Sequence, residues 1–304
     1  MGPQELSSPK SGGPRRFPAW LRKRIPAEGQ SNAVRAVLEE LRLATVCSSA
    51  RCPNIGECFA CGTAAFMIMG DTCMRRCNFC AVKHGAPAPL DADEPARVAE
   101  AASRMRLSYV VVTSVTRDDL PDGGALHFRR TVEAIRRRTN ASVEVLTPDF
   151  RGVMDSVETV ASAWPAVYNH NVETVPRLYA AIRPQADYAR SVRVLEYVAS
   201  RHPSVRTKSG LMVGLGESRD EVLGVMHDLR RAGCRMLTIG QYLQPSRRQA
   251  PVERFVTPEE FDNYRREGEA MGFAATAAGP FVRSSYRAVN LTAQADATSQ
   301  ENGV

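Results

Sequence analysis

Several features that are common in other classes of protein are missing from this sequence. No apolar run approaches the roughly 18 residues that a membrane-spanning helix requires, so we expect no membrane segment. No apolar signal-peptide region follows the N-terminus, and the first 18 residues, with three glycines and four prolines, suit a transit-peptide helix poorly. No basic block alternates with aromatic residues, the pattern that favours nucleic-acid binding. We therefore expect a cytoplasmic protein whose partners include neither a membrane nor a nucleic acid.

The composition is that of an ordinary globular protein. Of its 304 residues 43% are hydrophobic and 24% are charged, and a chain of this length can bury a full core as one domain. The formal net charge is +7, from 40 Lys and Arg against 33 Asp and Glu. Two interpretations of this excess stay open, a solvated arginine-rich surface or long-range attraction to an acidic partner.

Cysteine is the residue type that is concentrated. Seven of the eight cysteines fall between positions 47 and 80. Six of them form two groups, the first trio of Cys47, Cys52 and Cys58 and the second trio of Cys73, Cys77 and Cys80. Cys61 lies between the trios, and Cys234, which has no partner motif, is most simply a packing residue.

Three kinds of structure could explain such a density of thiols. Disulfides belong to oxidising compartments and usually to much smaller chains. Structural zinc prefers four ligands in two pairs, whereas these cysteines come in threes. Iron–sulfur clusters are held by cysteine thiolates, so they are the interpretation that the grouping favours.

The spacing of the second trio places three thiolates on one tight loop, directly after an expected strand at Ala64–Gly70. Three thiolates bind three irons of a [4Fe–4S] cube and leave the fourth iron without a ligand from the motif. An open metal position is typical of a site that performs chemistry.

The residues Cys73-Met-Arg-Arg-Cys77-Asn-Phe-Cys80 resemble the cluster loop of the radical S-adenosylmethionine (radical SAM) superfamily. In that superfamily SAM chelates the open iron, and an electron from the cluster cleaves the sulfonium to methionine and a 5′-deoxyadenosyl radical. Phe79, the aromatic residue before the last cysteine, is typical of the loop.

The segments around the first trio and beyond it resemble the lipoyl synthase family more specifically. The resemblance runs in the family's order from about Trp20 to Tyr286. It includes Cys52-Pro-Asn-Ile-Gly-Glu-Cys58, Thr113-Ser-Val-Thr-Arg-Asp-Asp-Leu-Pro-Asp-Gly-Gly124, Lys208-Ser-Gly-Leu-Met-Val-Gly-Leu-Gly-Glu217, Gly240-Gln-Tyr-Leu-Gln-Pro-Ser246 and Arg283-Ser-Ser-Tyr286.

The resemblance implies a sulfurtransferase that inserts two sulfur atoms at C6 and C8 of a protein-bound octanoyl-lysine. Unactivated C–H bonds resist polar chemistry, so a cofactor-derived radical is the appropriate reagent. Two [4Fe–4S] clusters and SAM are implied, with the cluster on the first trio donating its own sulfides. The implied partners are octanoylated lipoyl carrier domains (2-oxoacid dehydrogenase E2 and glycine-cleavage H protein), a ferredoxin- or flavodoxin-type electron donor and cluster assembly proteins.

The resemblance also implies individual site residues. Ser285 would complete the ligands of the auxiliary cluster, although Cys61 could do so instead, and Arg283 would steady the loop or the released serine. A hard alkoxide suits an iron–sulfur site less well than a thiolate does, so we infer that the serine bond is weak. The cofactor contacts implied are Phe79, Glu144, Asn171, Lys208 and Leu243. His170 is as easily explained as a structural residue.

From Ala64 onward, apolar strand-like runs alternate with amphipathic helical segments, which predicts a parallel sheet covered by helices. Strands are expected near 64–70, 109–115, 142–147, 166–171, 207–214 and 235–241, and helices near 94–105, 125–138, 153–163, 188–202, 219–231 and 258–271. Six such units match the partial (β/α)6 TIM-like barrel that the resemblance implies, with the sites at the shared mouth formed by the strand ends.

We expect four parts in the chain. Residues 1–18 form a disordered lead-in, 19–63 an N-terminal cysteine-rich extension, 64–274 the barrel, and 275–304 a short C-terminal extension with a loose tail from Thr292 to Val304. The sequence departs from the family at Ser246-Arg-Arg-Gln-Ala-Pro251 and at Arg287, where histidines are common.

Two rival functions fit parts of this pattern. A radical SAM methylthiotransferase acting on tRNA also pairs two clusters, but too little chain follows Tyr286 for its usual nucleic-acid-binding domain. A ferredoxin-like electron carrier needs neither a six-unit barrel nor an open iron.

Overall fold

The computed structural model describes residues 17–22, 32–60 and 64–301. Most of the lead-in expected over residues 1–18 lies outside these ranges, and so does Cys61.

One eight-stranded sheet organises the chain, with the strand order β1-β2-β5-β6-β7-β8-β9-β10. The edge strand β1 is antiparallel to β2, and all the other neighbours are parallel. The strands are β1 Ala44–Thr45, β2 Ala65–Ile68, β5 Tyr109–Ser114, β6 Ser142–Leu146, β7 Val167–Asn169, β8 Arg206–Val213, β9 Met236–Gln241 and β10 Ala275–Gly279. A separate pair, β3 Thr72–Cys73 and β4 Lys83–His84, carries the start of the second trio.

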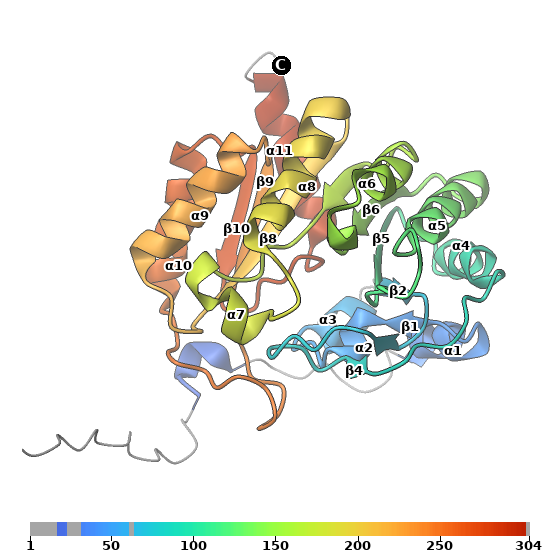
Figure 1. Ribbon diagram of the computed structural model, residues 1–304, viewed down its shortest axis with the longest axis horizontal. Coiled ribbons are helices and arrows are strands. Elements are labelled where there is room, and N and C mark those ends of the chain that lie inside the picture. Colours follow the sequence, from blue (N-terminus) through green and yellow to red (C-terminus); the bar gives the residue numbers. More distant parts are fainter. Residues whose placement is uncertain (1–16, 23–31, 61–63, 302–304) are drawn as a thin grey trace, which may run out of the picture.

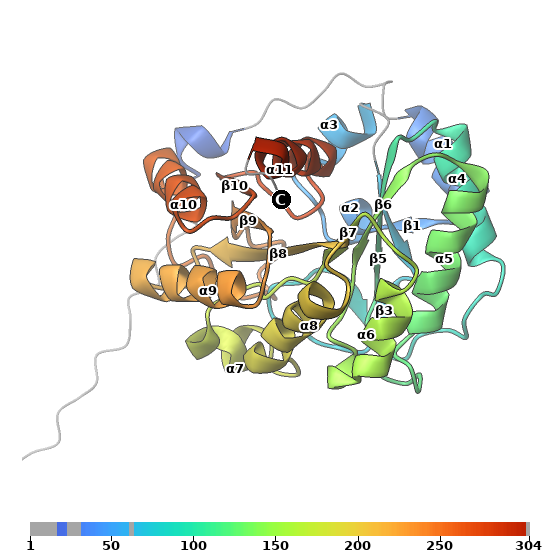
Figure 2. The same cartoon turned by 90° about the horizontal axis from the view of Figure 1, so that it is seen from above.

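Helices cover the outer face of the sheet, as parallel strands joined by crossovers require (Figure 1). Viewed from above, they form an arc around the curved sheet (Figure 2). The longer helices are α1 Asn32–Glu40, α4 Glu94–Arg104, α5 Ala125–Arg138, α6 Met154–Ala161, α8 Tyr188–Arg201, α9 Arg219–Arg231, α10 Pro258–Ala270 and α11 Ala288–Glu301. The short ones are η1 Ala19–Leu21, α2 Val46–Ser49, α3 Ile55–Ala60, η2 Phe150–Gly152, η3 Pro176–Leu178 and α7 Tyr179–Ile182.

Local sequence explains where these elements form. Every residue of β2 and of β9 is buried, the pattern of a parallel strand covered on both faces. Helices α9 and α10 begin at capping boxes, in which Ser218 and Thr257 accept a hydrogen bond from the backbone N–H three residues on. The glutamates at those third positions, Glu221 and Glu260, accept in return from the cap N–H.

The barrel is open, since the described strands end at β1 on one edge and β10 on the other. Helices α3 and α11 both lie at the open side of the arc in Figure 2, and Figure 1 shows them at different levels. Leu291 and Ala295 of α11 pack against the first residues of three strands, Val167, Met236 and Ala275. Helix α11 therefore covers the amino ends of the strands, which leaves the carboxyl ends as the mouth.

The six strands and six helices expected beyond Ala64 are confirmed, with shifts of one or two residues at their ends. Two features of the C-terminal part differ from expectation. A seventh parallel strand, β10, follows the six expected ones and pairs with β9. The tail expected to be loose from Thr292 is helical in α11 as far as Glu301, because Leu291, Thr292 and Ala295 find a buried surface. Its weak amphipathic pattern hid this helix.

None of the helices in the described ranges is both long enough and apolar enough to cross a bilayer.

The packing of α11 can be tested with Leu291→Ala, which removes a side chain that is only 6% exposed. We expect the free energy of unfolding to fall by about 2 kcal/mol, because a buried leucine loses its contacts and leaves a cavity. Val289→Ala, on the same helix but 47% exposed, is the control and should change stability by less than about 0.5 kcal/mol. Equal effects in urea denaturation would show that α11 does not pack as described.

Candidate metal-cluster site at the barrel mouth

The second trio lies on the loop that leaves strand β2. Backbone amides donate to two of its sulfurs, from Thr116 N to Cys73 Sγ at 3.3 Å and from Val82 N to Cys80 Sγ at 3.4 Å. Burial raises the pKa of the Cys77 thiol, and it raises that of Cys80 to about 12. Cys73 also raises the pKa of Cys77, and Cys73 and Cys77 both raise that of Cys80, so the three thiols are near neighbours.

These thiols fit the ligands of an iron–sulfur cluster. Amide hydrogen bonds to sulfur are a usual feature of such sites, and a buried thiol needs bound cations before it ionises at neutral pH. Within the described ranges, no three His, Cys, Asp or Glu side chains converge closely enough to hold one metal ion in common. A cube interposes several irons and sulfides, so its ligands stand further apart than those of a single ion.

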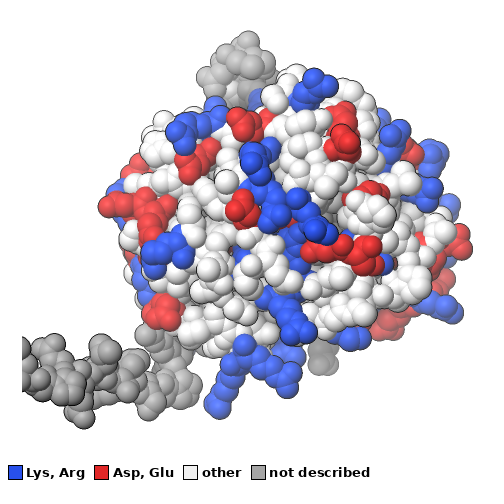
Figure 3. Space-filling view, viewed as in Figure 1, with Lys and Arg blue, Asp and Glu red and all other residues white. Residues whose placement is uncertain are grey.

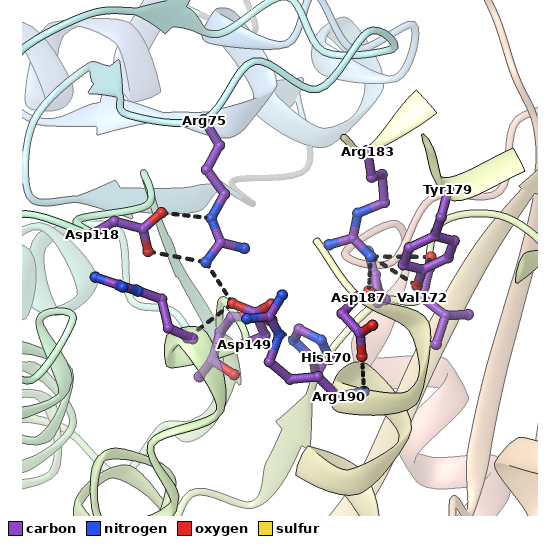
Figure 4. A network of polar contacts seen from close by, with 12 residues as sticks. Arg75, Asp118, Asp149, His170, Val172, Tyr179, Arg183, Asp187 and Arg190 are labelled. Atoms are coloured by element: carbon purple, nitrogen blue, oxygen red, sulfur yellow. Dashed lines mark hydrogen bonds and ion pairs between the residues drawn. The ribbon is translucent and has the colours of Figure 1, made fainter. Parts of the chain in front are cut away.

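A buried ionic network anchors this loop to the ends of two strands (Figure 4). Arg75 Nε and Nη2 donate to both oxygens of Asp118 at 2.8 and 3.0 Å, and Nη2 also donates to Asp149 Oδ1 at 2.7 Å. Arg190 approaches the other oxygen of Asp149 at 2.9 Å. Burial alone would raise the pKa of Asp149, but the hydrogen bond and charge of Arg75, together with His170 and Arg190, outweigh it and the pKa is about 2.

The neighbouring Arg183 binds backbone carbonyls of the β7 exit. Its Nη1 donates to the carbonyls of Asn171 and Val172, each at 3.1 Å, and to Tyr179 Oη at 3.2 Å. Its positive charge lowers the pKa of Cys77, against the larger effect of burial. His170 is a structural residue here, with Nδ1 2.8 Å from the Thr147 carbonyl and a pKa that burial lowers to about 4.

A cavity of about 390 Å³ lies at the mouth and brings distant parts of the sequence together. All three cysteines of the first trio line it, together with Cys80 of the second. Of the other predicted site residues, it is lined by Phe79, Asn171, Leu243, Arg283 and Ser285.

The first trio is positioned by two short helices. Thr45 caps α2, which holds Cys47, and Asn54 O accepts from the Cys58 amide at 2.9 Å at the start of α3. Burial is the main cause that raises the pKa of the Cys47 thiol, and the nearby Cys52 thiol raises it further.

The serine segment, residues 281–287, is tied to the first trio at both of its ends. Asn54 Nδ2 donates to the Phe281 carbonyl at 2.7 Å. Glu57 Oε1 accepts from Tyr286 Oη at 2.7 Å and from Arg287 Nη2 at 2.9 Å. Arg287, where the family commonly has histidine, therefore takes part in the tie to the residue before Cys58.

Two glycines allow the serine segment to lie against the inner face of the sheet. A Cβ on Gly210 would lie 2.6 Å from Thr238 Oγ1 and 2.9 Å from Ser284 Oγ, and one on Gly240 would collide with the Val282 carbonyl oxygen. Any larger residue would therefore push the segment away from β8 or β9.

The two serines have different surroundings. Ser284 Oγ accepts from Asn171 Nδ2 at 2.7 Å and lies 2.9 Å from Asn171 Oδ1, so its hydroxyl is committed to the barrel. The Ser285 hydroxyl lines the cavity and makes no hydrogen bond with the described part of the chain. Of the pair, Ser285 is the one available as a ligand.

Arg283 contributes positive charge to the cavity rather than a bond to the serine. Its Nη1 donates to the Val282 carbonyl at 2.6 Å. Burial lowers the pKa of its guanidinium, while Cys52 and Glu173 raise it. Glu173 also lines the cavity and was not among the predicted site residues; its only signal was a group of polar residues at one strand end.

Glu144 and Lys208, which the resemblance made cofactor contacts, do not line the cavity. They form a buried ion pair on the inner face of the sheet, with Lys208 Nζ 2.9 Å from Glu144 Oε1. Within the described part of the protein, the hydrogen-bonding groups of this pair all have partners among its own residues.

The segment 246–251, which departs from the family, contacts the second trio's loop. Gln249 Nε2 donates to the Cys80 carbonyl at 3.2 Å, and Ala250 N donates to Asn78 O at 2.7 Å. The local loop contact is thus made here without histidine.

Comparisons of the sequence find a matching family model and similar proteins of known family. A family model described as the radical SAM superfamily matches residues 67–229. The lipoyl synthase of Syntrophotalea carbinolica is 55% identical over 89% of this chain and 88% of that protein. The lipoyl synthase of Caldanaerobacter subterraneus subsp. tengcongensis is 56% identical over 90% of this chain and 96% of that protein.

Among solved structures, Streptococcus suis SuiB bound to S-adenosylmethionine superposes with a TM-score of 0.51 at 11% identity, over 71% of this chain and 50% of that one. This likeness concerns the fold alone.

The network around Arg75 predicts a pH-dependent loss of stability in Arg75→Met. Asp149, fully buried, would lose its main partner, so the free energy of unfolding of the iron-free chain should fall by about 3 kcal/mol at pH 7. The normal Asp149 pKa of about 2 lies below its unfolded value, so this carboxylate stabilises the fold above about pH 4 and the contribution is lost as pH falls through 2. In the variant burial raises the pKa, so the deficit should shrink between pH 7 and pH 4.

Arg76→Met is the matched control. The Arg76 side chain is exposed, and the hydrogen bond that this residue makes comes from its backbone amide, which donates to Gln185 Oε1. It should change stability by less than about 0.5 kcal/mol at both pH values. A deficit in Arg75→Met that is the same at pH 7 and pH 4 in chemical denaturation would contradict the role given to Asp149.

Proposed function

The chain belongs to the lipoyl synthase family of the radical SAM superfamily, and on this premise we propose which residues carry out each part of its reaction. It is a sulfurtransferase that inserts two sulfur atoms, at C6 and C8, into a protein-bound octanoyl-lysine, and it depends on a [4Fe–4S] cluster and SAM. The observation that carries the residue assignments is the cavity shared by the first trio, Cys80 and Ser285.

The second trio is proposed to hold the cluster that binds SAM. With SAM bound, this cluster supplies the electron that yields methionine and the 5′-deoxyadenosyl radical. The chain's own part is to fix the loop, through Arg75 and its two aspartates, and to stabilise thiolate charge through the amides of Thr116 and Val82.

The first trio and Ser285 are proposed to hold a second [4Fe–4S] cluster, which is consumed as the sulfur substrate. This ligand set is supported by Ser285, whose hydroxyl makes no hydrogen bond within the described ranges and which lines the same cavity as the three cysteines. Serine oxygen is a harder ligand than thiolate, so its bond to iron is the one most easily broken when the cluster is dismantled. Arg283, held near Cys52, would offset the negative charge of thiolates and of the released serine.

The cavity wall is proposed to position SAM and the octanoyl chain and to exclude water. Apolar side chains from several strand ends line it, among them Phe79, Leu211, Met212 and Leu243, so a hydrocarbon chain can enter without leaving polar groups unsatisfied. Phe79, Asn171 and Leu243 remain the proposed SAM contacts, with Glu173 added.

The substrate is an octanoylated lipoyl domain, and we propose the E2 component of a 2-oxoacid dehydrogenase and the glycine-cleavage H protein as its sources. A ferredoxin- or flavodoxin-type donor, cluster assembly proteins and a cytoplasmic location are proposed with it. Lys and Arg side chains gather across the middle of the face in Figure 3, with Asp and Glu beside them, which suits an acidic partner.

The function is tested by anaerobic reconstitution of the full chain with iron and sulfide, followed by reaction with SAM, dithionite and an octanoylated lysine peptide. We expect mass spectrometry to show the peptide gaining two sulfur atoms as a dithiol, with two hydrogens fewer after oxidation in air to the cyclic disulfide, and 5′-deoxyadenosine formed. A protein that binds a single cube, or that leaves the peptide unchanged while it cleaves SAM, would contradict the proposal of two clusters.

Replacing the proposed weak ligand should separate cluster stability from catalysis. Ser285→Cys places a thiolate on the fourth iron, so we expect the auxiliary cluster to persist and sulfur insertion to fall at least tenfold. Cys61→Ser is the matched control and should keep both clusters and normal lipoyl yield. Loss of about half of the iron in Cys61→Ser, as in a [4Fe–4S] site lost from two, would identify Cys61 as the ligand instead.

A further inference from the structure

The ion pair of Lys208 and Glu144 has no role in the reaction as described so far. Lys208 Nζ lies 2.9 Å and 3.1 Å from the two carboxylate oxygens of Glu144, and both side chains are 0% exposed. Lysine is scarce in this chain, with four in all, and Lys208 is the only one after Lys83. Burying both charges is unfavourable unless their remaining hydrogen-bonding groups are also satisfied.

The third hydrogen-bond acceptor of Lys208 belongs to the serine segment. Its Nζ donates to the Ser284 carbonyl at 2.7 Å, so three donors meet three acceptors. Glu144 accepts further from Tyr109 Oη at 2.7 Å and from Asn169 Nδ2 at 3.0 Å. The pair is therefore complete only when the backbone of Ser284 lies against the inner face of the sheet.

The other end of this network also reaches the C-terminal part of the chain. Tyr109 Oη lies 3.0 Å from Thr292 Oγ1, on the first turns of α11. The network thus holds the chain one residue before Ser285 and again seven residues after it. No other charged side chain hydrogen-bonds the Ser284 backbone within the described ranges.

We propose that Lys208 and Glu144 are positioning residues that hold Ser285 at the cavity edge, facing the first trio, and that they do not contact SAM. This rests on the proposed function insofar as Ser285 is a cluster ligand. If the serine segment moved away, the buried ammonium would lose one of its three acceptors, which is unfavourable where water cannot replace it. A compact ammonium suits this task, since its three donors point to three different groups.

The placement of the serine segment can be measured without any cluster. The double variant Lys208→Met with Glu144→Gln removes the pair without leaving a buried charge. In the full-length, iron-free chain we expect amide hydrogen exchange over residues 281–287 to become roughly tenfold faster or more, because the segment opens more often. Exchange in the central strands β5 and β8 should change much less.

His127→Leu is the matched control, because it removes a buried contact of 2.7 Å to Glu94 that joins helices α5 and α4 and involves no residue of the serine segment. It should leave exchange over 281–287 unchanged. If the double variant does not fold, Tyr109→Phe keeps the ion pair and should speed exchange only over the start of α11. Unchanged exchange over 281–287 in the double variant, or an equal increase throughout the barrel, would overturn the proposal.

A spectroscopic measurement on the reconstituted full chain separates positioning from general stability. The double variant should lose the auxiliary cluster to a chelator at least tenfold faster, measured by its visible absorbance, while the SAM cluster still forms 5′-deoxyadenosine. Adding Ser285→Cys should restore retention, since a thiolate binds iron more strongly than the alkoxide. Faster exchange with unchanged chelation would support the positioning of the segment and overturn the assignment of Ser285 as a ligand, so the two failures can be told apart.

Discussion

The close approach of residues 281–287 to the inner face of the sheet is the constraint on which the rest of the site depends. The segment leaves β10 at the mouth, passes Gly240 and Gly210, and reaches α11 at the opposite end of the strands. Only glycines leave room for this path. By taking it, Ser285 comes to line the same cavity as the three cysteines of the first trio.

Two buried ion pairs hold two different segments of the site in place. Arg75 with Asp149 fixes the loop of the second trio, and Lys208 with Glu144 lies under the serine segment. In each pair the cation binds one further group: Arg75 binds Asp118, and Lys208 binds the Ser284 carbonyl. If that group moved away, a buried charge would lose a hydrogen bond. The loop of the second trio and the serine segment are therefore held in place by the free-energy cost of an unsatisfied buried charge. The helices, by contrast, are held to the sheet by apolar packing.

Local sequence patterns predicted most of the helices and strands. The features that they did not predict depend on contacts between residues far apart in the sequence. Periodicity located six strands and six helices, and cysteine spacing located the loop of the second trio, because these signals lie within short stretches. Strand β10 is short and rich in alanine, and α11 is weakly amphipathic, so neither has a strong local pattern. The resemblance implied Glu144 and Lys208 as cofactor contacts, but the sequence did not show that the two bind each other, because a charge within an apolar strand signals burial but not the identity of its partner. Ser284 and Ser285 are neighbours of identical type, and only the bonds of Ser284 to Asn171 distinguish them.

The ties between the two ends of the chain have a consequence for biosynthesis. The ionic contacts of the second trio's loop involve residues up to Arg190, and its hydrogen bonds to Gln249 and Ala250 come later in the sequence. The first trio, by contrast, meets its partners only when residues 281–287 have been synthesised. Since a chain is made from its N-terminus, the contacts of the second trio's loop can form before those of the first trio, although the first trio comes earlier in the sequence.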